Sequence, residues 1–301
     1  MLRVETRGDR RWLLGRDLEV CLEDFGHSRH SATGPVFLLA SGPSASEFPL
    51  QRYRSLPVVA MNGSIVRCVD EGIKPFYYLC DDPNFVIGRP ELALLGVAHG
   101  EHLAMSLDVL QAIHAADATA LNGKKIYLLE RVNRQDGKAV LSDRAYAWSI
   151  RHDEELISDF SLLRRKPNRI GFSLNLKRGY FGSRTIPFGA LQLACHLGFR
   201  QVFVVGMDLR QSGGRFYEKG AAALPSSLDE DFEQYILPSF TLMARRILPR
   251  TGMQVFNLSA VSRMPERVIP KITLQRLDEL LGAELAGLSA ASSQAAPGDA
   301  S

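Results

Sequence analysis

The sequence predicts an α/β fold built on a doubly wound, mostly parallel sheet. Short apolar runs alternate along the chain with stretches that carry apolar residues at helical spacing. These runs are continuous rather than alternating apolar and polar, which is typical of strands buried on both faces of a parallel sheet. Strands that alternate with helices indicate parallel pairing, because each crossover returns the chain to the same end of the sheet.

Six runs are expected to form the strands of this sheet. "PVFLLA" at 35–40 is the first, and "FRQVFVVGMDLR" at 199–210 has the clearest pattern. In chain order, the expected strands are 35–40, 56–63, 73–82, 124–130, 199–210 and 252–259.

Two helices are predicted from spacing and end signals. "FGALQLACHLGF" at 188–199 has helical spacing and a glycine near its end, as a helix C-terminus requires. The stretch 227–250 begins with acidic residues and ends with arginines, which matches the helix dipole. Pro238 is expected to kink or divide this second helix.

These patterns suggest a domain organisation. Residues 1–33 are interpreted as an irregular N-terminal extension, and 34–285 as the sheet domain. A charged segment at about 131–182 does not follow the strand–helix rhythm and is interpreted as a lid insertion. The small, polar residues 286–301 are expected to be a disordered tail.

The composition is that of a soluble globular protein. The chain has 301 residues, 46% of them hydrophobic, and a net charge of +3 with pI near 8.7. This mild excess of positive charge suits an anionic small molecule or an anionic membrane surface, and it does not call for nucleic acid. The four cysteines form no C-x-x-C pair, and no signal peptide or run long enough to span a bilayer is evident. A cytoplasmic protein is expected.

Polar residues follow four of the expected strands. Ser41, Gly42, Pro43 and Ser44 follow the first strand. The others are Asn62 after the second, Asp81, Asp82 and Asn84 after the third, and Asp208 after "VVGM". Any one of these could be an ordinary cap or turn residue. Because ligands of open α/β sheets bind beyond the carboxyl ends of the strands, four polar strand ends together predict the binding site.

The first of these strand ends, "SGPSAS" at 41–46, combines a glycine turn with hydroxyl residues suited to a helix cap. A strand, a glycine turn and a helix N-terminus together form a natural anion pocket. The stretch matches neither the Walker loop nor the G-x-G-x-x-G dinucleotide motif. Together, the polar residues at the strand ends suggest a nucleotide site. The phosphate would rest on this loop, and the nucleoside would be held by Asn62 and by Asp82 or Asn84.

Four motifs carry a resemblance to known families. "LLASGPSASEF", "VVAMNGS", "FYYLCDDPNF" and "ALQLACHLGFRQVFVVGMDL" resemble, in order and spacing, motifs of the bacterial CMP-sugar transferases. These include sialyltransferases that use CMP-sialic acid and lipopolysaccharide-core enzymes that use CMP-Kdo. Archaeal 6-hydroxymethylpterin pyrophosphokinase-like proteins and flagellin-glycosylation accessory factors are similar too. The resemblance covers 36–85 and 185–218, and it implies a Rossmann-like fold of the glycosyltransferase type.

The resemblance also implies roles for the strand-end residues. Gly42 and Ser44 would meet the phosphate of cytidine monophosphate, while Asn62 and the turn 82–84 would hold the nucleoside. The predicted nucleotide-binding residues are Ser41, Gly42, Pro43, Ser44, Asn62, Asp82 and Asn84. The sialyltransferases have an asparagine in place of Asp82, so this contact differs here.

A second set is predicted to act on the reacting groups. The sialyltransferases place tyrosines after the "GMDL" strand to steady the departing phosphate, where this chain has Arg210 and, one position off, Tyr217. An arginine can perform the same electrostatic work. The predicted catalytic residues are Glu218, Asp208, Arg210 and Tyr217.

The general base of that family is a histidine, and this chain has none after His196. His196 lies in mid-helix and is expected to be a packed residue. Glu218 is the preferred candidate for the base, since a carboxylate whose pKa is raised by burial can accept the hydroxyl proton. Asp229 and Glu230 are further candidates, although acids at a helix start are usually solvated.

Three basic runs, 164–169, 177–184 and 244–250, are usually only solvated faces. With lipopolysaccharide core as the acceptor, they would bind its phosphates and carboxylates and hold the protein at the cytoplasmic face of the inner membrane.

The leading hypothesis is a glycosyltransferase that uses a CMP-activated acidic sugar, with Kdo favoured over sialic acid, to modify lipopolysaccharide core or a related surface glycan. No cofactor is required, although the carboxylates of Asp81 and Asp82 are candidate ligands for a Mg²⁺ ion. One alternative is an ATP-dependent pyrophosphokinase with Mg²⁺ on Asp81, Asp82 and Asp208. The other is a non-catalytic nucleotide-sugar-binding protein. Donor sugar, acceptor, linkage and oligomeric state stay open.

Overall fold

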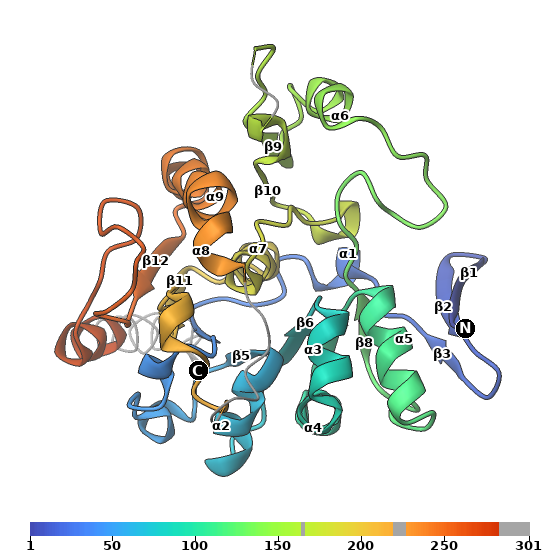
Figure 1. The fold of residues 1–301 in the computed structure, drawn as a ribbon, viewed down its shortest axis with the longest axis horizontal. Helices are drawn as coiled ribbons and strands as arrows, with labels where there is room; N and C mark the ends of the chain where they lie inside the picture. The colour runs from blue at the N-terminus through green and yellow to red at the C-terminus, as the bar shows by residue number, and fades with distance from the viewer. Residues whose placement is uncertain (164–165, 219–226, 283–301) are drawn as a thin grey trace, which may run out of the picture.

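A seven-stranded parallel sheet forms the centre of the computed structural model, which describes residues 1–163, 166–218 and 227–282 (Figure 1). Its strand order is β12-β11-β4-β5-β6-β7-β8. The bounds are β4 Pro35–Leu39, β5 Val58–Met61, β6 Tyr77–Cys80, β7 His102–Met105, β8 Ile126–Leu128, β11 Gln201–Val205 and β12 Gln254–Asn257. The predicted doubly wound α/β fold is confirmed. Each of the six expected segments contains one strand, and β7 was not predicted.

The strand order has one topological switch point, where successive connections run in opposite directions along the sheet, and we call it the crossing point. From β4 the chain adds β5, β6, β7 and β8 in one direction, and then places β11 on the other side of β4. β4 and β11 pair in register from Pro35 opposite Gln201 to Leu39 opposite Val205. The connections therefore diverge from this pair, and a crevice opens beyond its carboxyl end.

Both faces of the sheet are buried, each in its own hydrophobic core. In β4, Val36 and Leu38 belong to one core, while Phe37 and Leu39 belong to the other. The second core is covered by four helices: α2 Ile65–Asp70, α3 Pro83–Gly88, α4 Pro90–His99 and α5 Leu107–Ala116. Burial on both faces explains why the strands read as continuous apolar runs.

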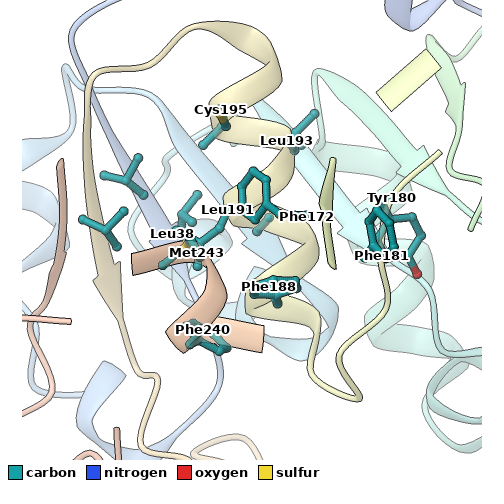
Figure 2. Packing of buried hydrophobic residues seen from close by; sticks show 14 of the residues in the cluster. Leu38, Phe172, Tyr180, Phe181, Phe188, Leu191, Leu193, Cys195, Phe240 and Met243 are labelled. Carbon is teal, nitrogen blue, oxygen red and sulfur yellow. The ribbon is translucent and has the colours of Figure 1, made fainter. Parts of the chain in front are cut away.

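Helix α7, Ile186–Leu197, forms the centre of the first core (Figure 2). Its Phe188 ring lies between Phe172 and Phe240, with ring centroids 5.6 and 5.1 Å apart. The helix ends at Gly198, whose φ of +100° is the left-handed conformation that a glycine C-cap supplies. The prediction for 188–199 is therefore confirmed.

The second predicted helix is one helical stretch that two π-helical segments interrupt. Its parts are α8 Leu228–Asp231, the π-helical η8 Phe232–Ile236, α9 Leu237–Leu242, the π-helical η9 Met243–Ile247 and α10 Leu248–Thr251. Each π-helical segment lies just before a proline, Pro238 or Pro249. A proline cannot donate a backbone hydrogen bond, and the stretch widens to i→i+5 bonds at these places.

The expectation that residues 1–33 are irregular was wrong. They contain a three-stranded antiparallel sheet, β1 Arg3–Arg7, β2 Arg10–Leu14 and β3 Glu19–Cys21, followed by the short helix α1 Phe25–Ser28. Gly8 opens the two-residue β1–β2 turn with φ of +63°, the sign that a type II′ turn requires at this position. One side of this small sheet packs on the protein and the other side carries many charged residues. The apolar runs that indicate a strand are therefore interrupted in the sequence.

The segment 131–182 stands above the carboxyl end of the large sheet (Figure 1). It contains α6 Asp143–Ser149 and an antiparallel pair, β9 Leu156–Ser158 and β10 Gly171–Ser173. Its described residues add no strand to the seven-stranded sheet. We call this segment the insertion, and its role as a lid stays a prediction, as do the domain boundaries. The expected disordered tail lies outside the described residues. Among the helices of the described chain, none is long and apolar enough to cross a bilayer.

His196 is fully buried in α7, as expected for a packed residue. Its Nδ1 accepts a hydrogen bond from the Leu176 amide at 3.2 Å, so the proton lies on Nε2, which donates to the Phe25 carbonyl at 2.7 Å. Burial lowers the pKa of His196 to about 4. This histidine holds the N-terminal segment and the insertion against α7.

We expect His196 to stay neutral down to about pH 4 in the folded protein, because burial disfavours its charged form. The folded-state pKa lies below the unfolded value of about 6.5, so the stability from neutral His196 is present above about pH 6.5 and is lost as pH falls toward 4. An NMR titration of the imidazole checks this, with urea-unfolded protein as the reference. Titration near pH 6.5 in the folded protein would contradict it.

Candidate active site

A cleft of about 910 Å³ lies beyond the carboxyl ends of β4, β5, β6 and β11, beneath the insertion. Most of the residues predicted from the strand ends line it. Those that do are Ser41, Gly42, Asn62, Asp81, Asp82, Asn84, Asp208, Arg210 and Glu218. Parallel pairing brings these ends to one edge of the sheet although they are far apart in sequence.

Three predicted residues do not line the cleft. Ser44 bonds to Asp208 just after β11, Pro43 precedes it in the same turn, and Tyr217 packs against Gly63 just after β5. A Cβ atom on Gly63 would lie 2.2 Å from the Tyr217 ring, so the two residues are in close contact. Burial raises the pKa of Tyr217 to about 12. In this position the Tyr217 ring packs against Gly63, its buried hydroxyl has no hydrogen-bond partner in the described structure, and its role at a departing phosphate stays a prediction.

Asp208 connects the ends of β4 and β11. Its carboxylate, 4% exposed, accepts hydrogen bonds from the Ser44 amide at 3.0 Å and from the hydroxyls of Ser44 and Ser259. Hydrogen bonds to a charged acceptor are roughly twice as strong as neutral ones. Asp208 lines the cleft, but its oxygens are engaged in shaping the loop after β4.

The close approach of the β4 and β11 ends leaves no room for a side chain at position 42, which explains the glycine there. Its amide donates to the Gly206 carbonyl at 2.8 Å, and a Cβ atom would lie 2.5 Å from that oxygen and 2.6 Å from the Asp208 carboxylate. The loop continues into a 3₁₀ turn, Pro43–Ala45, in place of the expected helix N-terminus. The amides of Gly42 and Ser44 donate to partners within the protein, so these two amides are not open to an anion, and phosphate binding at the loop stays a prediction.

Asn62 presents an unsatisfied group at the cleft. Its φ of +48° is left-handed, which asparagine tolerates better than most residues. Its Oδ1 atom is buried and has no hydrogen-bond partner in the described structure. Leaving a buried acceptor unpaired costs about 1–3 kcal/mol, so this oxygen indicates a place where a ligand donates a hydrogen bond.

An ionic cluster that sequence analysis missed lies at the side of the cleft. Asp81 accepts a hydrogen bond from Arg131 Nη2 at 2.6 Å and another from the Tyr180 hydroxyl. Burial raises the pKa of Tyr180, and the charge of Asp81 adds to the effect. Arg131 and Tyr180 lie at opposite ends of the insertion, where Val132 donates to the Tyr180 carbonyl at 3.0 Å. Asp81 thus joins both ends of the insertion to β6.

The N-terminus of α7 also opens on the cleft, which the sequence did not indicate. Ser183, Arg184 and Thr185 line the cleft just before the helix. The Ser183 hydroxyl is buried, with the residue 2% exposed, and has no partner in the described structure. Arg184 has a φ of +66°, and its guanidinium lies 5.5 Å from the Tyr235 ring centre. The positive end of the α7 dipole and this guanidinium favour a negative group here.

Backbone strain is concentrated at the cleft. Of the five non-glycine residues with positive φ in the described chain, four line it: Asn62, Asn133, Arg184 and Leu209. Strained conformations of this kind cluster at functional sites, where the surrounding structure holds them.

The charges of the cleft favour an anion. Arg215 forms an ion pair with Glu218 at 2.7 Å, and the Glu218 side chain is 4% exposed. Arg134, Arg184 and Arg210 also line the cleft and form no ion pair with a described residue. Nε of Arg210 donates to the Val261 carbonyl at 2.9 Å, which fixes the guanidinium.

The other candidate bases lie elsewhere. Asp229 is paired with Arg263 at 3.1 Å, and neither Asp229 nor Glu230 lines the cleft. The aspartates that a pyrophosphokinase would need are engaged separately, Asp81 by Arg131 and Asp208 by serines. Within the described ranges, no three His, Cys, Asp or Glu side chains form a group that could hold a metal ion.

Residues 22–275 match the family described as 3-deoxy-D-manno-octulosonic acid transferase WaaZ. The chain belongs to this family. Membership confirms the predicted class, a glycosyltransferase of the lipopolysaccharide-core Kdo transferase branch, and it does not favour the pyrophosphokinase alternative.

Two curated relatives belong to the same class. A probable 3-deoxy-manno-octulosonic acid transferase of Salmonella typhimurium is 28% identical over 244 residues, covering 81% of this chain and 88% of the relative. The protein of that name from Escherichia coli K12 is 27% identical over 265 residues, covering 88% and 89%. A solved structure, MAf glycosyltransferase from Magnetospirillum magneticum, is 17% identical with a TM-score of 0.43, and the match covers 87% of this chain and 38% of that protein.

We expect Gly42→Ala to lower the free energy of unfolding by about 1–3 kcal/mol, because the added methyl group overlaps the Gly206 carbonyl and the Asp208 carboxylate. Gly182→Ala is the matched control, since its Cβ atom would meet only Arg131 at 3.7 Å. Urea unfolding of both variants checks this, and equal stability of the two variants would contradict it.

Proposed function

We propose that this Kdo transferase family member transfers Kdo from CMP-Kdo to a lipopolysaccharide core or a related surface glycan. The observation that carries the proposal is the cleft at the crossing point of the sheet, in a member of this family. Its lining includes buried polar atoms without a hydrogen-bond partner and arginines without an ion pair in the described structure. Its position is where open α/β sheets bind nucleotides.

Asn62 is proposed to bind the nucleoside. Its unpaired Oδ1 needs a donor, and the 4-amino group of cytosine and the ribose hydroxyls are donors. Asp82 caps α3 by accepting from the Asn84 amide at 3.0 Å, which holds the turn 82–84 beside the end of β5. The exposed side chains of Asp82 and Asn84 supply further hydrogen-bonding groups at this wall of the cleft.

The acidic group of the sugar is proposed to bind at the N-terminus of α7. Kdo is an octulosonic acid and carries a carboxylate. The Ser183 hydroxyl is an unpaired donor there, and Arg184 adds a positive charge. A carboxylate at this place would satisfy Ser183 and interact favourably with the helix dipole.

The reaction is proposed to be a direct displacement. The acceptor hydroxyl oxygen attacks the anomeric carbon, the bond from this carbon to the phosphate oxygen breaks, and cytidine monophosphate leaves with the bonding electrons. Arg210 is proposed to steady the departing phosphate. Glu218 stays the proposed general base, and its ion pair with Arg215 fixes the direction of its carboxylate.

Calorimetric titration with CMP, CDP, UDP and ATP, with and without Mg²⁺, tests the proposal. Tight binding of CMP without metal is expected, followed by Kdo transfer when CMP-Kdo and acceptor are supplied. Mg²⁺-dependent binding of ATP in preference to CMP would support the pyrophosphokinase instead, and binding of none would refute a nucleotide site.

We expect Asn62→Gly to weaken CMP binding roughly tenfold, since glycine keeps the left-handed backbone and removes only the amide. Asn133→Gly is the matched control, because Asn133 also has positive φ. Its side-chain Oδ1 and Nδ2 atoms both form hydrogen bonds with the Leu141 backbone. Calorimetry measures both affinities. Equal CMP affinities in the two variants would remove Asn62 from the site.

We expect Ser183→Ala to raise KM for CMP-Kdo several-fold while leaving the affinity for CMP unchanged, because CMP lacks the sugar carboxylate. Ser158→Ala is the control, since its buried hydroxyl is also unpaired but lies outside the cleft. Steady-state kinetics and CMP titration separate the two effects, and an unchanged KM would refute this carboxylate site.

A further inference from the structure

The insertion carries the exposed apolar side chains Trp148, Leu162 and Leu163 together with the half-buried Phe160, and we call these four residues the apolar tip. Leu163 is 94% exposed, Leu162 66% and Trp148 49%. Nine large hydrophobic residues are exposed in the described chain, and five of them lie in residues 140–163. Exposure on this scale within one segment marks an interaction surface rather than scattered surface residues.

The local structure holds the tip in its exposed position. The buried Asn168 accepts a hydrogen bond from the Ser161 amide at 2.9 Å and donates to the Ser161 carbonyl at 3.1 Å. This bond pair anchors the chain directly before Leu162 and Leu163. The Trp148 and Phe160 ring centroids are 5.4 Å apart, so these two side chains pack against each other. The apolar tip is therefore part of the folded insertion.

Positive charge borders the tip. Arg144 precedes Trp148 by four positions, so the two lie on one side of α6, and Arg151 follows shortly after the end of this helix. The Arg151 guanidinium lies 3.7 Å from the Trp148 ring centre, and the residue is exposed. Two nearby acids, Glu154 and Asp159, are also exposed, so apolar contact has to supply most of the binding energy.

Tryptophan, leucine and arginine together are typical of surfaces that enter the interface of a bilayer, where the apolar bodies are buried and the charged groups reach the headgroups. A second copy of the chain is a poorer fit. A stable interface buries about 800 Å² per partner, and four side chains on a projection offer less.

We propose that the apolar tip inserts into the interface of a phospholipid bilayer that contains anionic lipids. The insertion that bears the tip also lines the cleft through Arg131, Tyr146 and Arg169. Docking of the tip therefore brings the cleft to the membrane surface, where a lipid-anchored glycan is presented. This last step rests on the proposed function, whereas bilayer binding does not.

Some residues of the basic runs 177–184 and 244–250, which the sequence suggested for this role, are engaged within the protein. Lys177 pairs with Asp24 at 2.7 Å and Arg178 with Asp153 at 2.5 Å. Arg246 donates to the Ser158 carbonyl at 2.8 Å. The leucines are therefore expected to supply most of the binding, and the role of the remaining basic residues of these runs stays a prediction.

Co-sedimentation with vesicles of phosphatidylcholine, alone or mixed with phosphatidylglycerol, tests the proposal. We expect the full chain to bind both, the anionic mixture more tightly. The double variant Leu162→Ser/Leu163→Ser should bind at least about tenfold more weakly. Ile87→Ser is the matched control, since Ile87 is 72% exposed in α3 outside the insertion, and it should bind like the unaltered chain.

Fluorescence gives a second readout, because Trp12 and Trp148 are the two tryptophans of the chain. In a Trp12→Phe variant, vesicles should shift the Trp148 emission to shorter wavelength. Absence of vesicle binding, equal binding by the double variant and the control, or a dimer in sedimentation velocity that the double variant abolishes would each overturn the proposal. CMP titration of the same variants is independent, so loss of CMP binding in all of them refutes the proposed function alone.

Discussion

At the crossing point of the sheet, one carboxylate is shared by three segments that are distant in sequence. Asp208, at the end of β11, accepts hydrogen bonds from Ser44 after β4 and from Ser259 after β12. The close approach of Gly42 to Gly206 depends on this arrangement. Ser41 and Arg210, which lie on either side of these bonds, reach the cleft only because the two strand ends are held together. The cleft is thus a product of β4–β11 pairing.

The insertion is tied to this frame at a second carboxylate. Asp81 binds Arg131 and Tyr180, so one residue of β6's end fixes where the insertion leaves the sheet domain and where it returns. Taking charges out of water is costly, and good geometry with full hydrogen bonding is needed to offset it. Between these two anchor points the insertion contributes residues to the wall of the cleft and also bears the apolar tip.

Sequence reasoning located the large sheet because strands such as β4 and β11 are apolar on both faces. It missed β7, whose run "HLAM" is short and begins with a histidine, and the N-terminal sheet, which is buried on one side only. At the cleft, strand ends were predictable because parallel pairing aligns them. The contributions of Arg131, Tyr180 and Ser183 were not, because tertiary packing alone brings these residues to the edge of the sheet.

The pairing of β4 has a consequence for synthesis of the chain. One neighbour, β5, follows β4 closely, but about 160 residues separate β4 from its other neighbour, β11. At usual translation rates this delay lasts roughly ten to thirty seconds. While the chain is still on the ribosome, the edge of β4 that later pairs with β11 has no partner strand. An unpaired edge of an apolar strand is a site of aggregation. The nascent chain is therefore expected to need chaperone protection until β11 has emerged.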